Sequence, residues 1–192
     1  MTKPQILRME HLNTFDPLTE NQSKCFNAWK QGDHLMMYGT AGTGKTFLGL
    51  YFALEKVLDK SNPTEKVVIV RSAVPTREIG YLPGTIDEKL EAYTTPYVPI
   101  MSTLFDDGGA YEKLIRAERL EIMSTSHIRG ITLDDTVVVV DECQNLTFHE
   151  LDSIITRLGR NSKIIFAGDY KQSDFNKEND RRGITTFINI IE

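Results

Sequence analysis

The stretch Gly39-Thr40-Ala41-Gly42-Thr43-Gly44-Lys45-Thr46 matches the phosphate-binding pattern GxxxxGK[ST] at every fixed position. Residues 34–38 before it form a short apolar run typical of a buried strand, and residues 47–58 after it carry apolar side chains at helical spacing. A strand, a glycine-rich loop and a helix in this order direct backbone N–H groups toward phosphate oxygens at the positive end of the helix. We therefore predict a nucleotide phosphate site that runs from Gly39 to Phe47.

Two side chains of this motif have separate tasks. Lys45 brings a positive charge to the β- and γ-phosphates, and the hydroxyl of Thr46 is a ligand for Mg²⁺. The alternative interpretation is a flexible surface loop, which would not need a strand before it and a helix after it. The context favours a site for a nucleotide and its magnesium ion.

A second motif follows the run Thr136-Val137-Val138-Val139-Val140. Consecutive valines cannot alternate between core and solvent, so this strand is predicted to be central and buried on both faces. Asp141 and Glu142 follow it, at the edge where open α/β sheets bind ligands. In that position Asp141 is the metal residue and Glu142 is the base that activates the attacking water. The alternative is an exposed acidic turn.

Polar residues also follow three other predicted strands. Arg71 and Ser72 end one of them, Arg129 follows the next, and Gln172 follows the last. Arg71, Ser72 and Arg129 are candidates for contacting a ligand at the same edge of the sheet. Gln172 is a candidate sensor of the γ-phosphate. The alternatives are a solvent-exposed strand end, a structural salt bridge and a polar loop, respectively.

The first helix is predicted to start at Thr19, because Thr19-Glu20-Asn21-Gln22 has the spacing of a capping box. Gln22 then has two alternative roles. Its amide either closes the box onto the backbone of Thr19, or uses its donor and acceptor to contact an adenine edge. The local sequence alone favours the cap.

The chain of 192 residues is 40% hydrophobic and 26% charged, which suffices for one core. We expect an irregular lead over residues 1–17 and one α/β domain over residues 18–192. Its sheet should be mostly parallel, with helices on both faces. Residues 74–107 are punctuated by Pro and Gly and should form a less regular insertion, with one helix from Thr85 to Tyr93.

Charge and cysteine content limit the function classes. A net charge of −5 argues against coating nucleic acid through bulk charge, although residues 157–182 hold seven Lys or Arg against four acidic residues. The two cysteines show no CxxC spacing, the four histidines show no metal-ligand spacing, and no apolar run is as long as a membrane span. These features predict a soluble cytoplasmic protein with no membrane partner.

Several short motifs, in order, resemble the PhoH-like family of P-loop ATPases, which is related to the RecA-like motor domain of superfamily 1 helicases. The compact form is similar to the bacteriophage-encoded members, which would place it in a host cytoplasm. The resemblance covers the chain from about Leu18 to Phe187. The motifs are LTENQ, GTAGTGKT, VRSAVPTREIGYLPG, HIRGITLDD, VVVVDECQN, TRLG and GDYKQSD.

The resemblance implies a single RecA-like P-loop NTPase domain with ATP and Mg²⁺ as cofactors. It implies that Gln22 contacts adenine, that Gln172 senses the γ-phosphate and that Arg71 lies near a nucleic-acid path. The implied function is ATP hydrolysis coupled to binding or remodelling of RNA or single-stranded DNA, in a hexameric ring. The rival is a nucleotide-dependent binding or assembly module with incidental ATPase activity. A small-molecule kinase is a third class, but Glu142 and Gln172 favour water as the acceptor.

The sequence departs from the family pattern at two places. Cys143 stands where the acidic motif usually has alanine, a change between small residues. The chain also stops at Glu192, before a further strand and helix that family members usually have, so we expect either a truncated or a reduced form. An arginine that completes the catalytic site would then come from a neighbouring subunit, and Arg157 is the first candidate.

Overall fold

The computed structural model describes residues 6–72, 94–169 and 178–191. Five strands form one sheet in the order β1-β5-β4-β2-β3, and every neighbouring pair is parallel. The strands are β1 (Leu35–Tyr38), β2 (Lys66–Arg71), β3 (Leu120–Ser124), β4 (Thr136–Val140) and β5 (Lys163–Gly168). Because all strands are parallel, their carboxyl ends meet at one edge.

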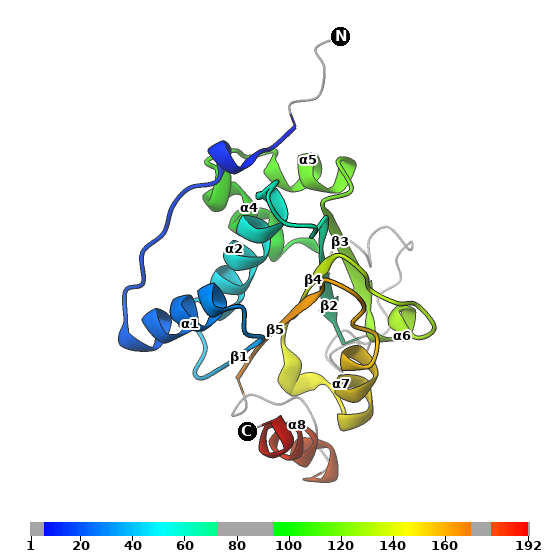
Figure 1. Ribbon diagram of the computed structural model, residues 1–192. Helices are drawn as coiled ribbons and strands as arrows, with labels where there is room; N and C mark the ends of the chain where they lie inside the picture. Colours follow the sequence, from blue (N-terminus) through cyan, green and yellow to red (C-terminus); the bar gives the residue numbers. More distant parts are fainter. Residues whose placement is uncertain (1–5, 73–93, 170–177, 192) are drawn as a thin grey trace, which may run out of the picture.

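Helices cover both faces of the sheet (Figure 1). One face packs against α1 (Glu20–Gln31), α2 (Lys45–Leu58), α4 (Tyr97–Phe105) and α5 (Ala110–Arg116). The other packs against α6 (Thr125–Ile128), α7 (Phe148–Ile155) and α8 (Glu178–Ile191). Two short 3₁₀ helices, η1 (Met9–His11) and η2 (Cys143–Asn145), complete the described elements. The predicted α/β fold with a parallel sheet is confirmed.

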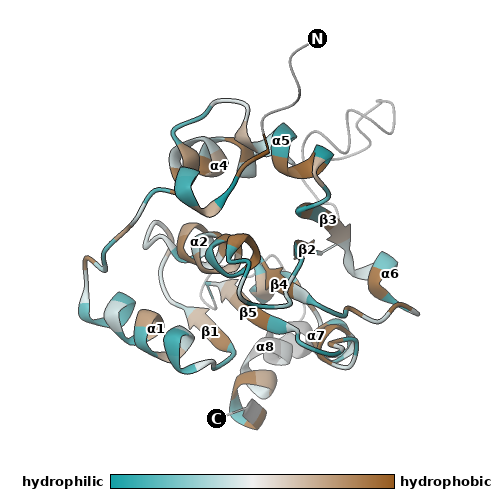
Figure 2. Cartoon of the chain, turned by 45° about the horizontal axis from the view of Figure 1, so that its top comes forward, coloured by the Kyte–Doolittle hydropathy of each residue, from teal (hydrophilic) through white to brown (hydrophobic). Residues whose placement is uncertain are grey.

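The valine-rich strands separate the two cores residue by residue. Val137 and Val139 of β4 belong to the core under α2, whereas Val138 and Val140 belong to the core under α7, and all four are fully buried. This alternation confirms that β4 is buried on both faces, between β5 and β2. Figure 2 shows the strands and α2 as the hydrophobic centre of the molecule, with a largely hydrophilic α1 at its periphery.

Side-chain caps start two helices, the first of them where the sequence predicts it. The Thr19 hydroxyl accepts a hydrogen bond from the Gln22 backbone N–H at 3.2 Å, and α1 begins at the next residue. At α7, Thr147 and Glu150 form a complete capping box. Both satisfy backbone donors that the first helical turn leaves without partners.

The structure corrects the expected insertion at one place. Residues 97–105 form α4, although Pro96 and Pro99 favour a loop on sequence grounds. Pro96 is the N-cap and Pro99 lies in the first turn, where a missing N–H costs no helical hydrogen bond. After β3, residues Thr125–Ile128 form the short helix α6. The predicted helix from Thr85 to Tyr93 falls outside the described residues.

Within the described ranges of the chain, no helix is long and apolar enough to cross a membrane.

Candidate nucleotide and magnesium site

The phosphate loop connects β1 to α2 at the carboxyl edge of the sheet. Gly39, Gly42 and Gly44 have φ angles of 155°, 75° and 78°, which side chains with a Cβ rarely adopt. Gly44 is the N-cap of α2, so the loop runs straight into the helix N-terminus. The positive end of the helix dipole therefore faces the loop, which favours an anion there.

The Lys45 side chain folds back over this loop. Its ammonium donates to the carbonyl oxygens of Gly39 and Thr40 at 3.0 and 2.7 Å and to the Thr43 hydroxyl at 3.3 Å. The loop thus holds a positive charge beside the helix N-terminus, using only its own backbone and one hydroxyl. This arrangement adds a cation to a place where the backbone already favours anions.

Thr46 and Asp141 join the two predicted motifs. The Thr46 hydroxyl donates to Oδ1 of Asp141 at 2.7 Å, across 95 residues of sequence. In the sheet, β5 lies between β1 and β4, the two strands that lead into these motifs. Thr46, at the start of α2, therefore reaches across the carboxyl end of β5 to contact Asp141. A hydroxyl and a carboxylate oxygen suit Mg²⁺, which takes few protein ligands and completes its shell with water and phosphates. The residues present therefore fit the metal.

Glu142 is held by the turn after β4. Its φ is 51°, a left-handed conformation that is strained for a residue with a side chain. The buried Gln144 donates from Nε2 to Oε2 of Glu142, and its Oε1 accepts from the Asp169 backbone N–H at 3.0 Å. Gln144 therefore ties the predicted base to the end of β5. It belongs to the quoted motif VVVVDECQN, but no sequence signal gave it a role.

Close packing fixes the same turn against β5. A methyl group on Gly168 would lie 2.5 Å from Sγ of Cys143 and 2.7 Å from Oε1 of Gln144, so only glycine fits there without a shift. Burial, and then the charges of Asp141 and Glu142, raise the pKa of the Cys143 thiol to about 12. Cys143 therefore packs as a neutral side chain beside the two carboxylates.

Tyr97 is a second residue of the site that had no sequence signal. Tyr97, at the start of α4, is fully buried, and its hydroxyl donates to Oδ2 of Asp141 at 2.9 Å. Burial, and next the charge of Asp141, raise the pKa of Tyr97, so the hydroxyl stays protonated. The guanidinium carbon of Arg71 lies 5.8 Å from the centre of the Tyr97 ring. Sequence reasoning missed Tyr97 because it lies among the prolines of the expected insertion.

The other predicted site residues fall into different positions. Arg71 and Ser72 lie at the end of β2, at the carboxyl edge, and Arg129 is exposed one helical turn after β3. The Gln22 side-chain oxygen accepts from the Leu18 backbone N–H at 2.6 Å, a local contact like the predicted cap. Gln172 falls outside the described residues.

Arg157 lies at the opposite edge of the sheet. Its carbonyl oxygen accepts from the Leu133 backbone N–H at 2.8 Å, and Leu133 precedes the first residue of β4. Six residues of β5 alone span roughly 20 Å at the usual rise of a strand. The structure therefore does not bring Arg157 to the phosphate loop of its own chain.

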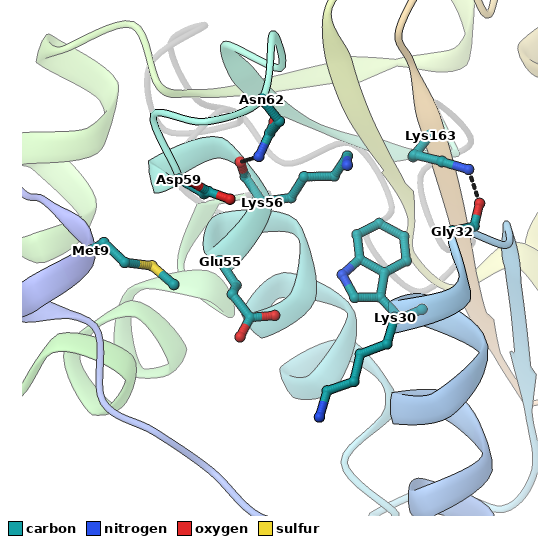
Figure 3. Close-up of a pocket in the computed structure, with 9 residues that line it drawn as sticks. Met9, Lys30, Gly32, Glu55, Lys56, Asp59, Asn62 and Lys163 are labelled. Carbon is teal, nitrogen blue, oxygen red and sulfur yellow. Dashed lines mark hydrogen bonds between the residues drawn. The ribbon is translucent and has the colours of Figure 1, made fainter.

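A separate cavity of about 280 Å³ also lies at that opposite edge (Figure 3). It is formed where α1 and α2 end, and Lys163 at the start of β5 donates to the Gly32 carbonyl beside it. Glu55 and the ammonium groups of Lys30 and Lys56 also line it. Its charges are mixed, and it shares no residue with the phosphate loop.

The described residues define a P-loop fold: an all-parallel α/β sheet with a phosphate-binding loop and a hydroxyl–carboxylate pair at its carboxyl edge. The family model for PhoH-like protein matches residues 14–192. A PhoH-like protein of Mycobacterium leprae is 34% identical over 182 residues, covering 93% of this chain and 50% of the relative. The chain belongs to the PhoH-like family.

Two proteins of Bacillus subtilis are also similar. A PhoH-like protein is 37% identical over 162 residues, covering 83% of this chain and 49% of its own length. Protein PhoH2 is 37% identical over 142 residues, covering 72% of this chain and 32% of its own. The chain spans about half the length of the PhoH-like relatives.

Among solved structures, the chain is similar to the Sulfolobus solfataricus SWI2/SNF2 ATPase core in complex with dsDNA. The TM-score is 0.44 at 17% identity, and the match covers 95% of this chain and 37% of that one.

Proposed function

We propose that this protein binds ATP at the loop from Gly39 to Phe47 and hydrolyses it to ADP and phosphate with Mg²⁺. The observation that carries the proposal is the 2.7 Å contact between Thr46 and Asp141, because it joins a phosphate motif to a metal-binding carboxylate. Mg²⁺ bound there neutralises charge on the β- and γ-phosphates. Membership of the PhoH-like family supports the same class of activity.

Each motif then has a distinct role. Lys45 moves its three hydrogen bonds from the loop to phosphate oxygens, which present stronger acceptors. Glu142, oriented by Gln144, accepts the proton of the attacking water. Gln172 senses the γ-phosphate, and Gln22 exchanges its contact with Leu18 for the adenine edge.

We further propose that ATP turnover is coupled to RNA or single-stranded DNA. Arg71 and Ser72 at the end of β2 and the exposed Arg129 after α6 lie toward the carboxyl edge that also holds the phosphate loop. Positive side chains in such a position bind a phosphate backbone with little sequence preference. A cytoplasmic location, where both ATP and nucleic acid are present, is part of this proposal.

Steady-state ATP turnover with and without RNA or single-stranded DNA tests the coupling. We expect stimulation by at least one nucleic acid and binding that weakens steeply with salt. Arg129→Glu should reduce stimulation while leaving turnover without nucleic acid unchanged. Arg116→Glu, an exposed arginine on α5, is the matched control. Turnover without any response to nucleic acid, and no binding at low salt, would favour the assembly-module rival.

A further inference from the structure

Tyr97 makes a contact that the phosphate loop, the acidic pair and the proposed reaction leave unexplained. It is the first residue of α4, no part of it is exposed, and its hydroxyl reaches Oδ2 of Asp141. Neither the phosphate loop nor the acidic pair contains it. The hydroxyl therefore lies in a hydrophobic core with a metal-site carboxylate as its acceptor.

The two oxygens of Asp141 have different partners. Oδ1 faces the Thr46 hydroxyl on the side of the phosphate loop, and Oδ2 faces Tyr97 on the side of the core. The backbone N–H of Asp141 donates to the Val70 carbonyl at 3.0 Å, which fixes the main chain beside the end of β2. Rotation of the carboxylate plane would break the contact with Tyr97, so this contact restricts the orientation in which Asp141 faces the phosphate loop.

The helix that carries Tyr97 is fixed at several places. Met101 and Leu104, further along α4, are fully buried in the core under α2. The Leu104 carbonyl accepts from the Asn13 backbone N–H at 2.8 Å, so the chain before α1 also fixes this helix. The Arg71 guanidinium lies within cation–π range of the ring. Because the position of Tyr97 is fixed in this way, its hydroxyl can hold the Asp141 carboxylate in one orientation.

We propose that Tyr97 is a positioning residue for Mg²⁺ binding, acting through the orientation of the Asp141 carboxylate. The inference rests on the proposed function, because it concerns the same metal. Partners that orient a metal ligand typically change metal affinity by about 10- to 100-fold when removed. A tyrosine that served only as core filling would affect stability and leave the metal unaffected.

The test compares Tyr97→Phe with Tyr51→Phe. Tyr51 is also buried in the core under α2, but its hydroxyl contacts Glu55 at 3.5 Å, away from Asp141. Both variants lose one hydroxyl from a buried ring of the same core. For each protein we measure the affinity for a non-hydrolysable ATP analogue in Mg²⁺ and in EDTA, and the ratio of the two affinities is the Mg²⁺ enhancement. Thermal unfolding of each protein is measured as well.

We expect Tyr97→Phe to lower this Mg²⁺ enhancement about tenfold while its affinity in EDTA stays that of the wild type. Tyr51→Phe should keep the full enhancement. Should Tyr97→Phe fold poorly, 4-aminophenylalanine at position 97, which keeps a donor in the same place, should restore the enhancement. An unchanged or larger enhancement in Tyr97→Phe overturns the positioning role while the proposed function stands. If neither the wild type nor any variant binds the nucleotide, or if the affinity of the wild type does not depend on Mg²⁺, both the positioning role and the proposed function are overturned.

Discussion

At the scale of single residues, Lys45 shows how the loop keeps a charge ready for a ligand. Its ammonium donates hydrogen bonds to three oxygens of the loop. In the proposed function, nucleotide binding exchanges these neutral acceptors for charged ones, and hydrogen bonds between charged groups are the stronger kind.

Lys45→Ala should therefore weaken ATP binding by roughly 10- to 100-fold, because it removes a charge-assisted contact to the phosphates. Equilibrium binding of ATP in Mg²⁺ measures the change. Lys56→Ala, near the opposite end of the same helix, is the matched control and should bind as the wild type does. Equal affinities of the two variants would remove Lys45 from the phosphate site.

Gly168→Ala should disturb the turn that carries Glu142. The added methyl group collides with Cys143 and Gln144, and Gln144 orients Glu142. Overpacking of this kind costs about 1–3 kcal/mol of stability, and turnover should fall with it. Gly108→Ala, where nothing lies within 4 Å of the added atom, should change neither quantity. Urea unfolding and phosphate release report the two effects; a Gly168→Ala protein matching its control contradicts the packing argument.

At the scale of elements, the predictable parts are those whose signal is local. Four valines place β4 in the centre, and the glycine-rich loop is followed by the helix that the apolar spacing predicts. The two motifs of the site could be expected to meet because parallel strands share a carboxyl edge. Their actual contact, Thr46 with Asp141, agrees with that expectation.

The parts that sequence reasoning missed depend on tertiary contacts. α4 carries Pro99 in its first turn, and its buried side chains belong to the core under α2. Tyr97 acquires its role from a carboxylate 44 residues away. Gln144 does so from the backbone of Asp169, 25 residues away. The local sequence around Tyr97 or Gln144 cannot predict contacts with residues so far away in the chain.

The capping box of α7 provides a prediction at this scale. Thr147→Ala removes the side chain that accepts from Glu150, and it should lower the free energy of unfolding by about 1 kcal/mol. Thr156→Ala, at the end of the same helix, loses only hydroxyl contacts to helix carbonyls and should cost less. Urea titrations of both proteins decide between them; equal losses would show that the box contributes nothing special.

At the scale of the whole molecule, the phosphate loop and the candidate Arg157 lie at opposite edges of the sheet. Arg157 precedes β5, whereas the phosphate loop follows β1 at the far edge. We propose a head-to-tail ring, most simply a hexamer, in which Arg157 completes the site of the next subunit. A contact of this type repeats without a two-fold axis and closes by rotation.

Mixing two inactive proteins tests the ring. Lys45→Ala and Arg157→Ala should each lack activity alone, and a mixture should regain part of it, because some interfaces then combine an intact loop with an intact arginine. Arg160→Ala, whose guanidinium lies 3.6 Å from Asp135 at the same edge, is the control and should remain active. A fully active monomer, judged by light scattering, would rule out the ring.

The most direct test of the proposed ATP hydrolysis is phosphate release from ATP by the wild type and by Glu142→Gln, each in Mg²⁺ and in EDTA. We expect release by the wild type in Mg²⁺ only, and a rate about a hundredfold lower for Glu142→Gln despite normal ATP binding. Equal rates for the two proteins, or equal rates with and without Mg²⁺, would contradict it.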